Sequence, residues 1–421
     1  MDTPPCRKNR ADKQRKLKNS IQIKKQTNIN FINTSTSVRT MPFEDYISLD
    51  QKVCQLASGI ETNLLTYANP QNLEEEKKKF FEKISKKEEY NPVFTYAPRN
   101  PLYSYFTMSH SFNTYKSELK ELLNEISTYE ENTLALIFEK KILDLFDRME
   151  LIRSVGTQNF SGNSESYYGS IDHRTLKFAK EFLKKQFEPE KEEIRFEDAK
   201  KIIQTFLRKR KLSYKVVQRE STGSKFAVNI RTKEILISKN VLLSTTSLKR
   251  LIAHEIEGHI YRYENGAKQP YLIFARGLSK ETIETEEGIA VIIEQEQGIN
   301  IDSQLKEYSG RVLAIEIATK KSFYQTFQEM RNYFSDEEAF NLTLRAKRGT
   351  WKQDQEGAFT KDASYLKGYL AIQEFLKKQK LEELYYGRYS INDTPLALEV
   401  DGLVKPTYLP DFLKNVEKVK K

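Results

Sequence analysis

Cysteine and long apolar runs are almost missing from this sequence. Its 421 residues include two cysteines, Cys6 and Cys54, which are too few for a disulfide framework. We therefore expect a reducing, cytoplasmic location. The chain has no run of ~18 apolar residues that would predict a transmembrane helix. The basic N-terminus is not followed by the apolar segment of a secretory signal, so no signal peptide is expected either.

Glycine is also scarce, with 16 residues, whereas charged residues make up 30% of the chain. This balance is typical of a helix-rich, soluble protein. The hydrophobic content of 38% is enough for a sizeable core, and the length allows about two to three domains.

The net charge of +10 is unevenly distributed. Residues 1–25 contain nine Lys/Arg and two Asp, a net charge of +7, which leaves +3 for residues 26–421. Residues 1–40 are polar and basic and end in a Ser/Thr/Asn run, so we expect a disordered tail. Such a tail either serves as a solubilising arm or contacts an acidic polymer, such as nucleic acid, anionic lipid or an acidic protein surface.

Apolar residues at helical spacing predict a helical N-terminal region over residues 41–210. The clearest helices are expected at 116–127, 131–152, 174–186 and 196–207. Between the second and third of them, residues 159–169 are rich in Gly and Ser and are expected to form a loop.

The pattern changes to alternation over residues 213–238. Residues 213–217 and 226–230 alternate apolar and polar side chains, and residues 221–224 between them are typical of a turn. Residues 231–238 add a third extended segment. We expect a small antiparallel sheet here. Helices are expected again from about Thr246, with the clearest at 284–297, 304–319, 336–346 and 362–377. The fold class is therefore α+β and mostly helical.

Histidine is rare as well, but two of the four histidines fall in one segment, Ala253-His254-Glu255-Ile256-Glu257-Gly258-His259. Neutral imidazole is a good zinc ligand. A catalytic zinc site needs three protein ligands and an open position for water, and the metal lowers the pKa of that water towards ~7. Glu255 follows the first histidine and is placed to accept the proton. We expect one Zn²⁺ per chain.

The spacing of the two histidines is unusual. The familiar zinc-peptidase pattern places them four residues apart, whereas here they are five apart, ~140° around an ideal helix. A π-bulge would return both side chains to one face, and Gly258 is where we expect the irregularity. The alternative is that His254 and His259 are surface residues of an ordinary helix.

A following helix supplies candidates for the third ligand. Residues Thr285-Glu286-Glu287-Gly288-Ile289-Ala290 open a helix that continues through Val291-Ile292-Ile293. Helical geometry does not choose between Glu286 and Glu287. Either acid could instead interact with the helix macrodipole at the N-terminus.

At this point the sequence resembles a known family. The pattern His-Glu-x-x-x-His followed by Glu-Gly-Ile-Ala is similar to the "QEGLA-motif" family of bacterial proteins, which includes the eukaryotic microtubule-associated tyrosine carboxypeptidases. The resemblance covers roughly residues 45–415. Its best blocks are residues 254–259, 265–270, 286–290 and 357–368.

The resemblance implies roles for four residues. His254, His259 and Glu287 would be the metal ligands, and Glu255 the catalytic acid and base. The sequence departs from the family pattern at Glu286, where bacterial relatives often have glutamine, and at Ile289, but neither is one of the implied ligands. The implied fold is zincin-like, with residues 211–421 forming a catalytic region on which C-terminal helices pack.

Three further residues are candidates for substrate contact. Lys361 and Tyr365 lie four residues apart and so share a helix face. Lys361 could hold a substrate carboxylate, and Tyr365 could donate to the developing oxyanion. The alternative is a lysine at a helix start and a tyrosine in the core. Arg276 is a second candidate carboxylate clamp. The segment starting at Arg231 could form an edge strand that pairs with an extended substrate, or an ordinary structural strand.

These observations predict a zinc metallopeptidase. Its resemblance to tyrosine carboxypeptidases implies removal of a C-terminal residue, expected to be tyrosine or another aromatic residue, from a peptide or protein. The first alternative is a zinc hydrolase acting on a non-peptide amide. The second is a non-catalytic protein whose basic tail binds an acidic polymer. Glu255 argues against the second alternative, because a structural zinc site needs no such acid and usually has four protein ligands.

Overall fold

The computed structural model describes residues 43–61, 64–96, 112–129, 132–186, 193–219, 226–239 and 242–416. The expected basic tail, residues 1–40, lies outside the described residues. Among the described residues, no helix combines the length and the apolar character needed to cross a membrane.

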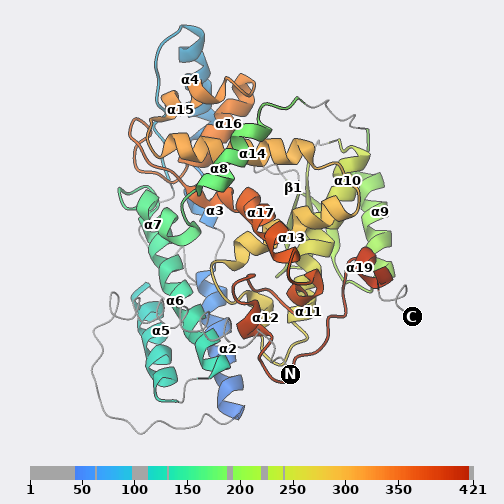
Figure 1. The fold of residues 1–421 in the computed structure, drawn as a ribbon. Helices are drawn as coiled ribbons and strands as arrows, with labels where there is room; N and C mark the ends of the chain where they lie inside the picture. The colour runs from blue at the N-terminus through green and yellow to red at the C-terminus, as the bar shows by residue number, and fades with distance from the viewer. Residues whose placement is uncertain are drawn as a thin grey trace, which may run out of the picture.

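The first half of the described chain is helical (Figure 1). Its helices are α2 (Phe43–Ile60), α3 (Leu64–Ala68), α4 (Leu73–Ser85), α5 (Phe112–Ser127), α6 (Thr133–Ser154), α7 (Phe160–Tyr168), α8 (His173–Phe182) and α9 (Phe196–Lys209). The expectation of a loop at residues 159–169 is wrong, because this segment forms α7. Phe160, Ser164, Tyr167 and Tyr168 lie at helical spacing and are buried. Their burial outweighs the low helix propensity of the Gly and Ser residues between them.

A three-stranded sheet follows, formed by β1 (Lys215–Arg219), β2 (Phe226–Asn229) and β3 (Glu234–Ser238). Its order is β1-β3-β2, with β1 parallel and β2 antiparallel to β3. The expected antiparallel sheet is therefore wrong in part, since the sheet is mixed. The strands lie in the three segments expected to be extended, and Val216, Ile235 and Ile237 share the buried face of the sheet. Alternation carries no information on strand order, and here β3 inserts between the two strands that precede it.

The rest of the described chain is again helical. Its elements are α10 (Thr245–Leu251), the π-helix η2 (Ile252–Ile260), α11 (Tyr261–Gly266), α12 (Ile273–Arg276), α13 (Thr282–Glu296), α14 (Asp302–Ala318), α15 (Phe323–Met330), α16 (Asp336–Lys347), the 3₁₀ helices η3 (Thr360–Ala363) and η4 (Leu381–Leu384), α17 (Ser364–Leu376), α18 (Thr394–Ala397) and α19 (Asp411–Val416). The expectation of a mostly helical α+β fold is confirmed.

Helices α13 and α17 pack closely in the centre of the molecule (Figure 1). They cross at two glycines. A methyl group on Gly288 would lie 2.3 Å from the main-chain carbon of Gly368, and one on Gly368 would lie 2.0 Å from the carbonyl oxygen of Glu284. No side chain larger than hydrogen fits at this crossing. The two glycines therefore bring the segment around Glu287 against the start of α17.

The N-terminal helices are tied to the later elements through buried polar contacts. Asp50 of α2 accepts hydrogen bonds from the main-chain nitrogens of Leu272, at 2.5 Å, and Ile273, at 3.0 Å, where α12 begins. Lys140 of α6 forms an ion pair with the buried Asp393, just before α18. These contacts hold α2 and α6 against the part of the chain that carries the histidines.

Candidate metal centre

The two histidines of the motif lie on η2, which runs from Ile252 to Ile260 with π-helical geometry. Because hydrogen bonds in a π-helix join residues five apart, His254 and His259 come to the same side. The predicted π irregularity is confirmed, although it extends over nine residues rather than being confined to Gly258. A methyl group on Gly258 would lie 3.1 Å from Cβ of Ala290, so this glycine lets η2 pack tightly on α13.

Three side chains converge between η2 and α13. Oε2 of Glu287 lies 3.5 Å from Nε2 of His254 and 4.0 Å from Nε2 of His259. One ligand atom from each of the three residues lies within 4.8 Å of the other two. Among the described residues, this is the one group of three or more potential ligands close enough to share a metal ion.

Two buried carboxylates orient the imidazole rings from behind. Nδ1 of His254 lies 2.8 Å from Oε1 of Glu294, and Nδ1 of His259 lies 3.2 Å from Oε2 of Glu286. Because a carboxylate accepts the hydrogen bond, each Nδ1 carries the hydrogen. Both Nε2 atoms are thereby turned towards Glu287, the arrangement typical of histidines that bind zinc.

Each supporting carboxylate is itself held by arginine. Arg250 donates from Nε to Glu294 at 2.9 Å. Arg262, which is fully buried, donates from Nη1 to Glu286, and Arg388 donates to the other oxygen at 3.3 Å. The sequence reasoning identified neither Glu294 nor these arginines. A usable signal existed for Glu294, which is an acid in an apolar stretch seven residues, or two helical turns, after Glu287.

The charges around the centre favour a cation. Burial opposes a charged imidazole, but hydrogen bonds to Glu287 and Glu294 outweigh it and raise the pKa of His254 well above its ordinary value. Burial would raise the pKa of Glu287, but His254, His259 and Lys361 together lower it. The carboxylates thus require positive charge between them, a condition that a divalent metal ion also satisfies.

Glu255 lies beside this group, next to His254 in the sequence. The side chain is half-buried, and within the described part of the chain its carboxylate takes part in no hydrogen bond or ion pair. Its charge acts on His254. A carboxylate without a described partner therefore lies next to the candidate metal ligands.

Lys361 and Tyr365 approach the same group from η3 and α17. The charge of Glu287 acts on both side chains. Burial lowers the pKa of Lys361, and no described carboxylate lies within ion-pair distance of its ammonium group. The Tyr365 ring stacks on Tyr308 with 4.9 Å between ring centroids, and the guanidinium of Arg311 lies 4.6 Å from its centroid. Lys361 and Tyr365 thus present a cation and a hydroxyl near the centre.

The other candidates lie elsewhere. The charge of Arg276 acts on Cys54 of α2, and it is not among the main charges that act on His254 or Glu287. The segment starting at Arg231 contributes β3, which has a partner strand on each side. The suggestion that β3 is an edge strand is therefore wrong, because β2, its hairpin partner, occupies the outer position.

Comparison with known proteins identifies the family of this chain. The profile of the family described as "Microtubule-associated tyrosine carboxypeptidase" matches residues 78–421. The chain belongs to this family. Among its curated members, microtubule-associated tyrosine carboxypeptidase 1 of Mus musculus is 31% identical over 181 residues, which is 41% of this chain and 37% of the relative. The Rattus norvegicus protein of the same name is 30% identical over 182 residues, with the same two shares.

The Homo sapiens member of that name is 27% identical over 228 residues, which is 48% of this chain and 46% of the relative. The chain thus spans less than half of the length of each of these relatives. The family resemblance that the motifs indicated is confirmed by the match over residues 78–421.

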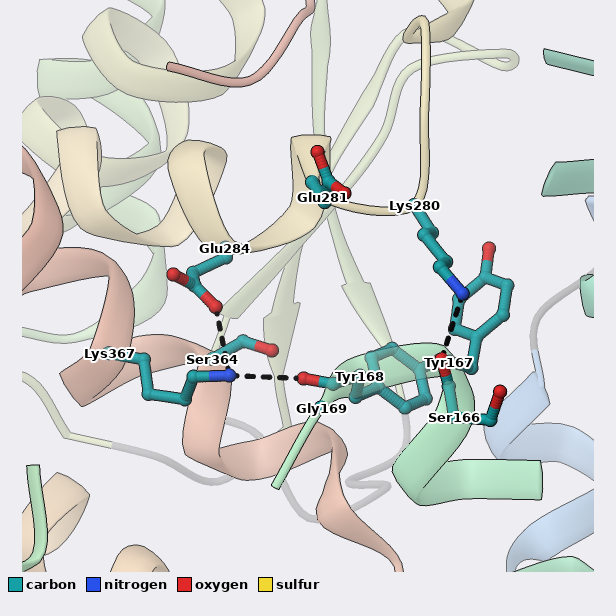
Figure 2. Close-up of a pocket in the computed structure, with 9 residues that line it drawn as sticks. All are labelled: Ser166, Tyr167, Tyr168, Gly169, Lys280, Glu281, Glu284, Ser364 and Lys367. Atoms are coloured by element: carbon teal, nitrogen blue, oxygen red, sulfur yellow. Dashed lines mark hydrogen bonds and ion pairs between the residues drawn. The ribbon is translucent and has the colours of Figure 1, made fainter. Parts of the chain in front are cut away.

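A cavity of about 260 Å³ lies next to the family's motif residues, between α7, α13 and α17 (Figure 2). Its walls include Glu284, one turn before Glu287, and Ser364, one turn after Lys361. Lys367 forms an ion pair with Glu284 at 3.2 Å and donates to the carbonyl oxygen of Tyr168 at the same distance. Lys280 donates to the carbonyl oxygen of Ser166 at 2.8 Å. The cations of this cavity are thus already paired within the protein.

The buried ion pair behind His259 yields a test of stability. Burial acts against ionised Glu286, but Arg262 and Arg388 outweigh it and lower its pKa from 4.5 to about 2. Glu286→Gln should lower the free energy of unfolding by ~3–5 kcal/mol at pH 7, because it leaves buried Arg262 without a counter-charge. A carboxyl group whose pKa is lowered on folding stabilises the protein at pH values above the ordinary pKa of that group. The difference between wild type and variant should therefore shrink as the pH falls from about 4.5 to about 2.

Denaturant unfolding monitored at several pH values measures this difference. Glu296→Gln is the matched control, since Glu296 is an exposed acid on the same helix. A loss no larger than that of the control would contradict the role of the buried pair.

Proposed function

We propose that this protein is a zinc-dependent carboxypeptidase that removes a C-terminal residue, with tyrosine or another aromatic residue as the expected product, from a peptide or protein. The observation that carries the proposal is the convergence of three metal-ligand atoms next to a half-buried carboxylate, Glu255, that has no partner among the described residues. Family membership supports the peptidase reaction.

Zinc is the ion that best suits these donors. Two imidazoles and one carboxylate are typical of catalytic zinc sites. At zinc–ligand distances of ~2.0–2.1 Å, tetrahedral ligand atoms lie roughly 3.3 Å apart. The distances of 3.5 Å and 4.0 Å from Glu287 to the two Nε2 atoms need only a small contraction. Three protein ligands also leave one position open, which distinguishes the site from a closed structural one.

When bound, zinc would polarise the scissile carbonyl and lower the pKa of the attacking water. Within the protein, the carboxylate of Glu255 accepts the proton of that water and transfers it to the leaving amine. Glu286 and Glu294 keep the rings of His254 and His259 fixed through hydrogen bonds at Nδ1, so the two Nε2 atoms hold their positions during the reaction.

Lys361 and Tyr365 are proposed to act on the substrate. The ammonium group of Lys361 meets the terminal carboxylate, which would be costly to bury without a cation. The hydroxyl of Tyr365 donates a hydrogen bond to the oxygen that becomes negative during attack. Tyr308 and Arg311 position the Tyr365 ring through stacking and cation–π contact. Arg276, which lies near Cys54, is the weaker candidate for the carboxylate contact.

The substrate and the setting are part of the proposal. The relatives are named as microtubule-associated tyrosine carboxypeptidases, which favours a protein C-terminus as the substrate. We place the catalytic residues in a region from residue 211 onwards, supported by the helices of residues 41–210. The basic tail of residues 1–40 is proposed to contact acidic polymers or protein surfaces, and a cytoplasmic location suits a chain with two cysteines.

Separating metal binding from chemistry tests the site. Purified wild type should carry about one zinc per chain, and His254→Ala should lose most of it, whereas His173→Ala, at an exposed histidine, should not. Glu255→Gln should keep the metal and lose peptide cleavage by ~100-fold or more, because an amide cannot transfer the proton. Metal content by elemental analysis and cleavage by mass spectrometry give the two readings. If the Glu255→Gln variant is as active as wild type, Glu255 is not the residue that transfers the proton.

Lys361 has its own test. Lys361→Met should weaken cleavage of a peptide with a free C-terminus by ~10–100-fold, because it removes a charge-assisted hydrogen bond worth ~1.5–3 kcal/mol. The effect on the corresponding amidated peptide should be small. Lys377→Met, at an exposed lysine on the surface after α17, is the matched control. If the wild-type enzyme cleaves the free-acid and amidated peptides at equal rates, it is an endopeptidase and the carboxypeptidase assignment fails.

A further inference from the structure

The residue after Lys361 is an acid, Asp362, to which the proposed function gives no role. Both residues belong to η3, but Lys361 is half-buried, whereas Asp362 is 1% exposed. Successive side chains of a 3₁₀ helix point ~120° apart. Asp362 can therefore enter the protein interior while Lys361 reaches towards the metal centre.

The Asp362 side chain ties η3 to the end of α16. Its Oδ2 accepts a hydrogen bond from Nε of Arg345 at 2.6 Å and another from Nη2 of Arg348 at 3.4 Å. Arg345 lies in the last turn of α16, and Arg348 directly follows the helix. A main-chain hydrogen bond from Phe359 to Ala346, at 2.7 Å, joins the same two segments. The entry into η3 is thus fixed on α16 by two charge-assisted contacts and one main-chain contact.

Helix α7 also holds η3. The main-chain nitrogen of Thr360 donates to Oγ of Ser164 at 2.8 Å, and Oγ1 of Thr360 donates to the carbonyl oxygen of Ser164 at 3.0 Å. The residues on both sides of Lys361 are therefore anchored, whereas no described carboxylate pairs with its own ammonium group. Because a short 3₁₀ helix has poor hydrogen-bond geometry of its own, the position of Lys361 depends on these anchors.

Asp362 also lies in a group with an excess of positive charge. The group consists of four cations and two acids, namely Arg311, Arg345, Arg348, Lys361, Asp362 and Glu307. Glu307 accepts a hydrogen bond from Arg311 at 2.5 Å, and Asp362 accepts from the other two arginines. Four positive and two negative charges leave an excess of two positive charges next to the metal centre.

Within this group, Asp362 is the charge that acts most strongly on Lys361. Burial lowers the pKa of Lys361, and Arg348 and Arg345 lower it further, whereas Asp362 and, to a smaller extent, Glu287 oppose them. Glu287 is assigned to the metal. Asp362 is therefore the acid that offsets the arginines around Lys361.

We propose that Asp362 is a positioning residue for recognition of the substrate's terminal carboxylate: it anchors the segment that presents Lys361 and offsets the arginines behind it. This inference rests on the proposed carboxypeptidase function. Asp362 is too deeply buried to contact the substrate, so it acts through Lys361. An incoming carboxylate reduces the excess of positive charge in this group, whereas an amide does not.

Binding to a protein that does not turn over separates recognition from chemistry. The parent protein is the full chain with Glu255→Gln, which is expected to keep the site and lose cleavage. The probes are a fluorescein-labelled peptide that ends in tyrosine with a free C-terminus, and the same peptide with an amidated C-terminus. Anisotropy gives the ratio of the two dissociation constants, and this ratio measures recognition of the carboxylate.

Asp362→Asn in this parent should reduce the preference for the free acid by ~10-fold or more, because an amide neither holds the two arginines firmly nor offsets their charge. The matched control is Asp393→Asn. Asp393 is equally buried, at 1% exposed, and pairs with Lys140, but it lies outside this group. The control should lose stability and keep the preference within about threefold of the parent.

A charge-conserving variant covers the case in which Asp362→Asn does not fold. Arg345→Lys keeps the charge but loses the hydrogen bond from Nε, and Arg345 is 22% exposed, so the change is milder than at Asp362. The preference for the free acid should fall by ~3–10-fold. Arg331→Lys, at an exposed ion pair with Asp336, should leave it unchanged.

Combination with Lys361→Met identifies the route. If Asp362 acts through Lys361, Asp362→Asn should reduce the preference no further when Lys361→Met is present. Additive losses would show that Asp362 acts elsewhere and overturn the proposal. An unchanged preference in both Asp362→Asn and Arg345→Lys would overturn it as well, with the carboxypeptidase function intact. A parent that binds acid and amide equally would remove the terminal-carboxylate contact itself, and the role of Asp362 would fall with it.

Discussion

Two buried carboxylates, Glu286 and Glu294, hold the imidazoles of His254 and His259, and the rest of the centre depends on these contacts. Each carboxylate needs a counter-charge because it is nearly inaccessible to water, and arginine supplies it in both cases. Breaking such a pair leaves an uncompensated charge and costs ~3–5 kcal/mol. The centre is therefore rigid for an electrostatic reason, and the two Nε2 atoms are held in place before any ligand arrives.

Helix α13 carries the three glutamates that build this centre. It carries Glu286, Glu287 and Glu294, two of which support the histidines and one of which faces their Nε2 atoms. Its close crossing with α17 at Gly288 and Gly368 brings Lys361 and Tyr365 to the same place. The crossing also explains why glycine follows Glu287 directly. A side chain at that position would push α17 away and separate the candidate substrate contacts from the candidate metal ligands.

Sequence reasoning found the helices, the strands and the π-helical distortion, since each has a local signal. Five-residue histidine spacing requires a π-helix if both side chains are to reach one ion. The sequence alone could not establish the order of the strands or distinguish Glu286 from Glu287. Both the strand order and the roles of these two acids depend on which distant residues pack next to them. Glu286 faces Arg262 and Arg388, and Glu287 faces the imidazoles, and neither fact can be read from helical periodicity. Helix α7 was missed because burial of its aromatic residues outweighed local propensity.

The central claim is that His254, His259 and Glu287 share one zinc ion. Anomalous diffraction at the zinc absorption edge, from crystals of the zinc-loaded protein, tests it most directly. The account predicts a single strong peak ~2.0–2.1 Å from both Nε2 atoms and from a carboxylate oxygen of Glu287. A zinc peak bound by other residues, with none between these three, would contradict it.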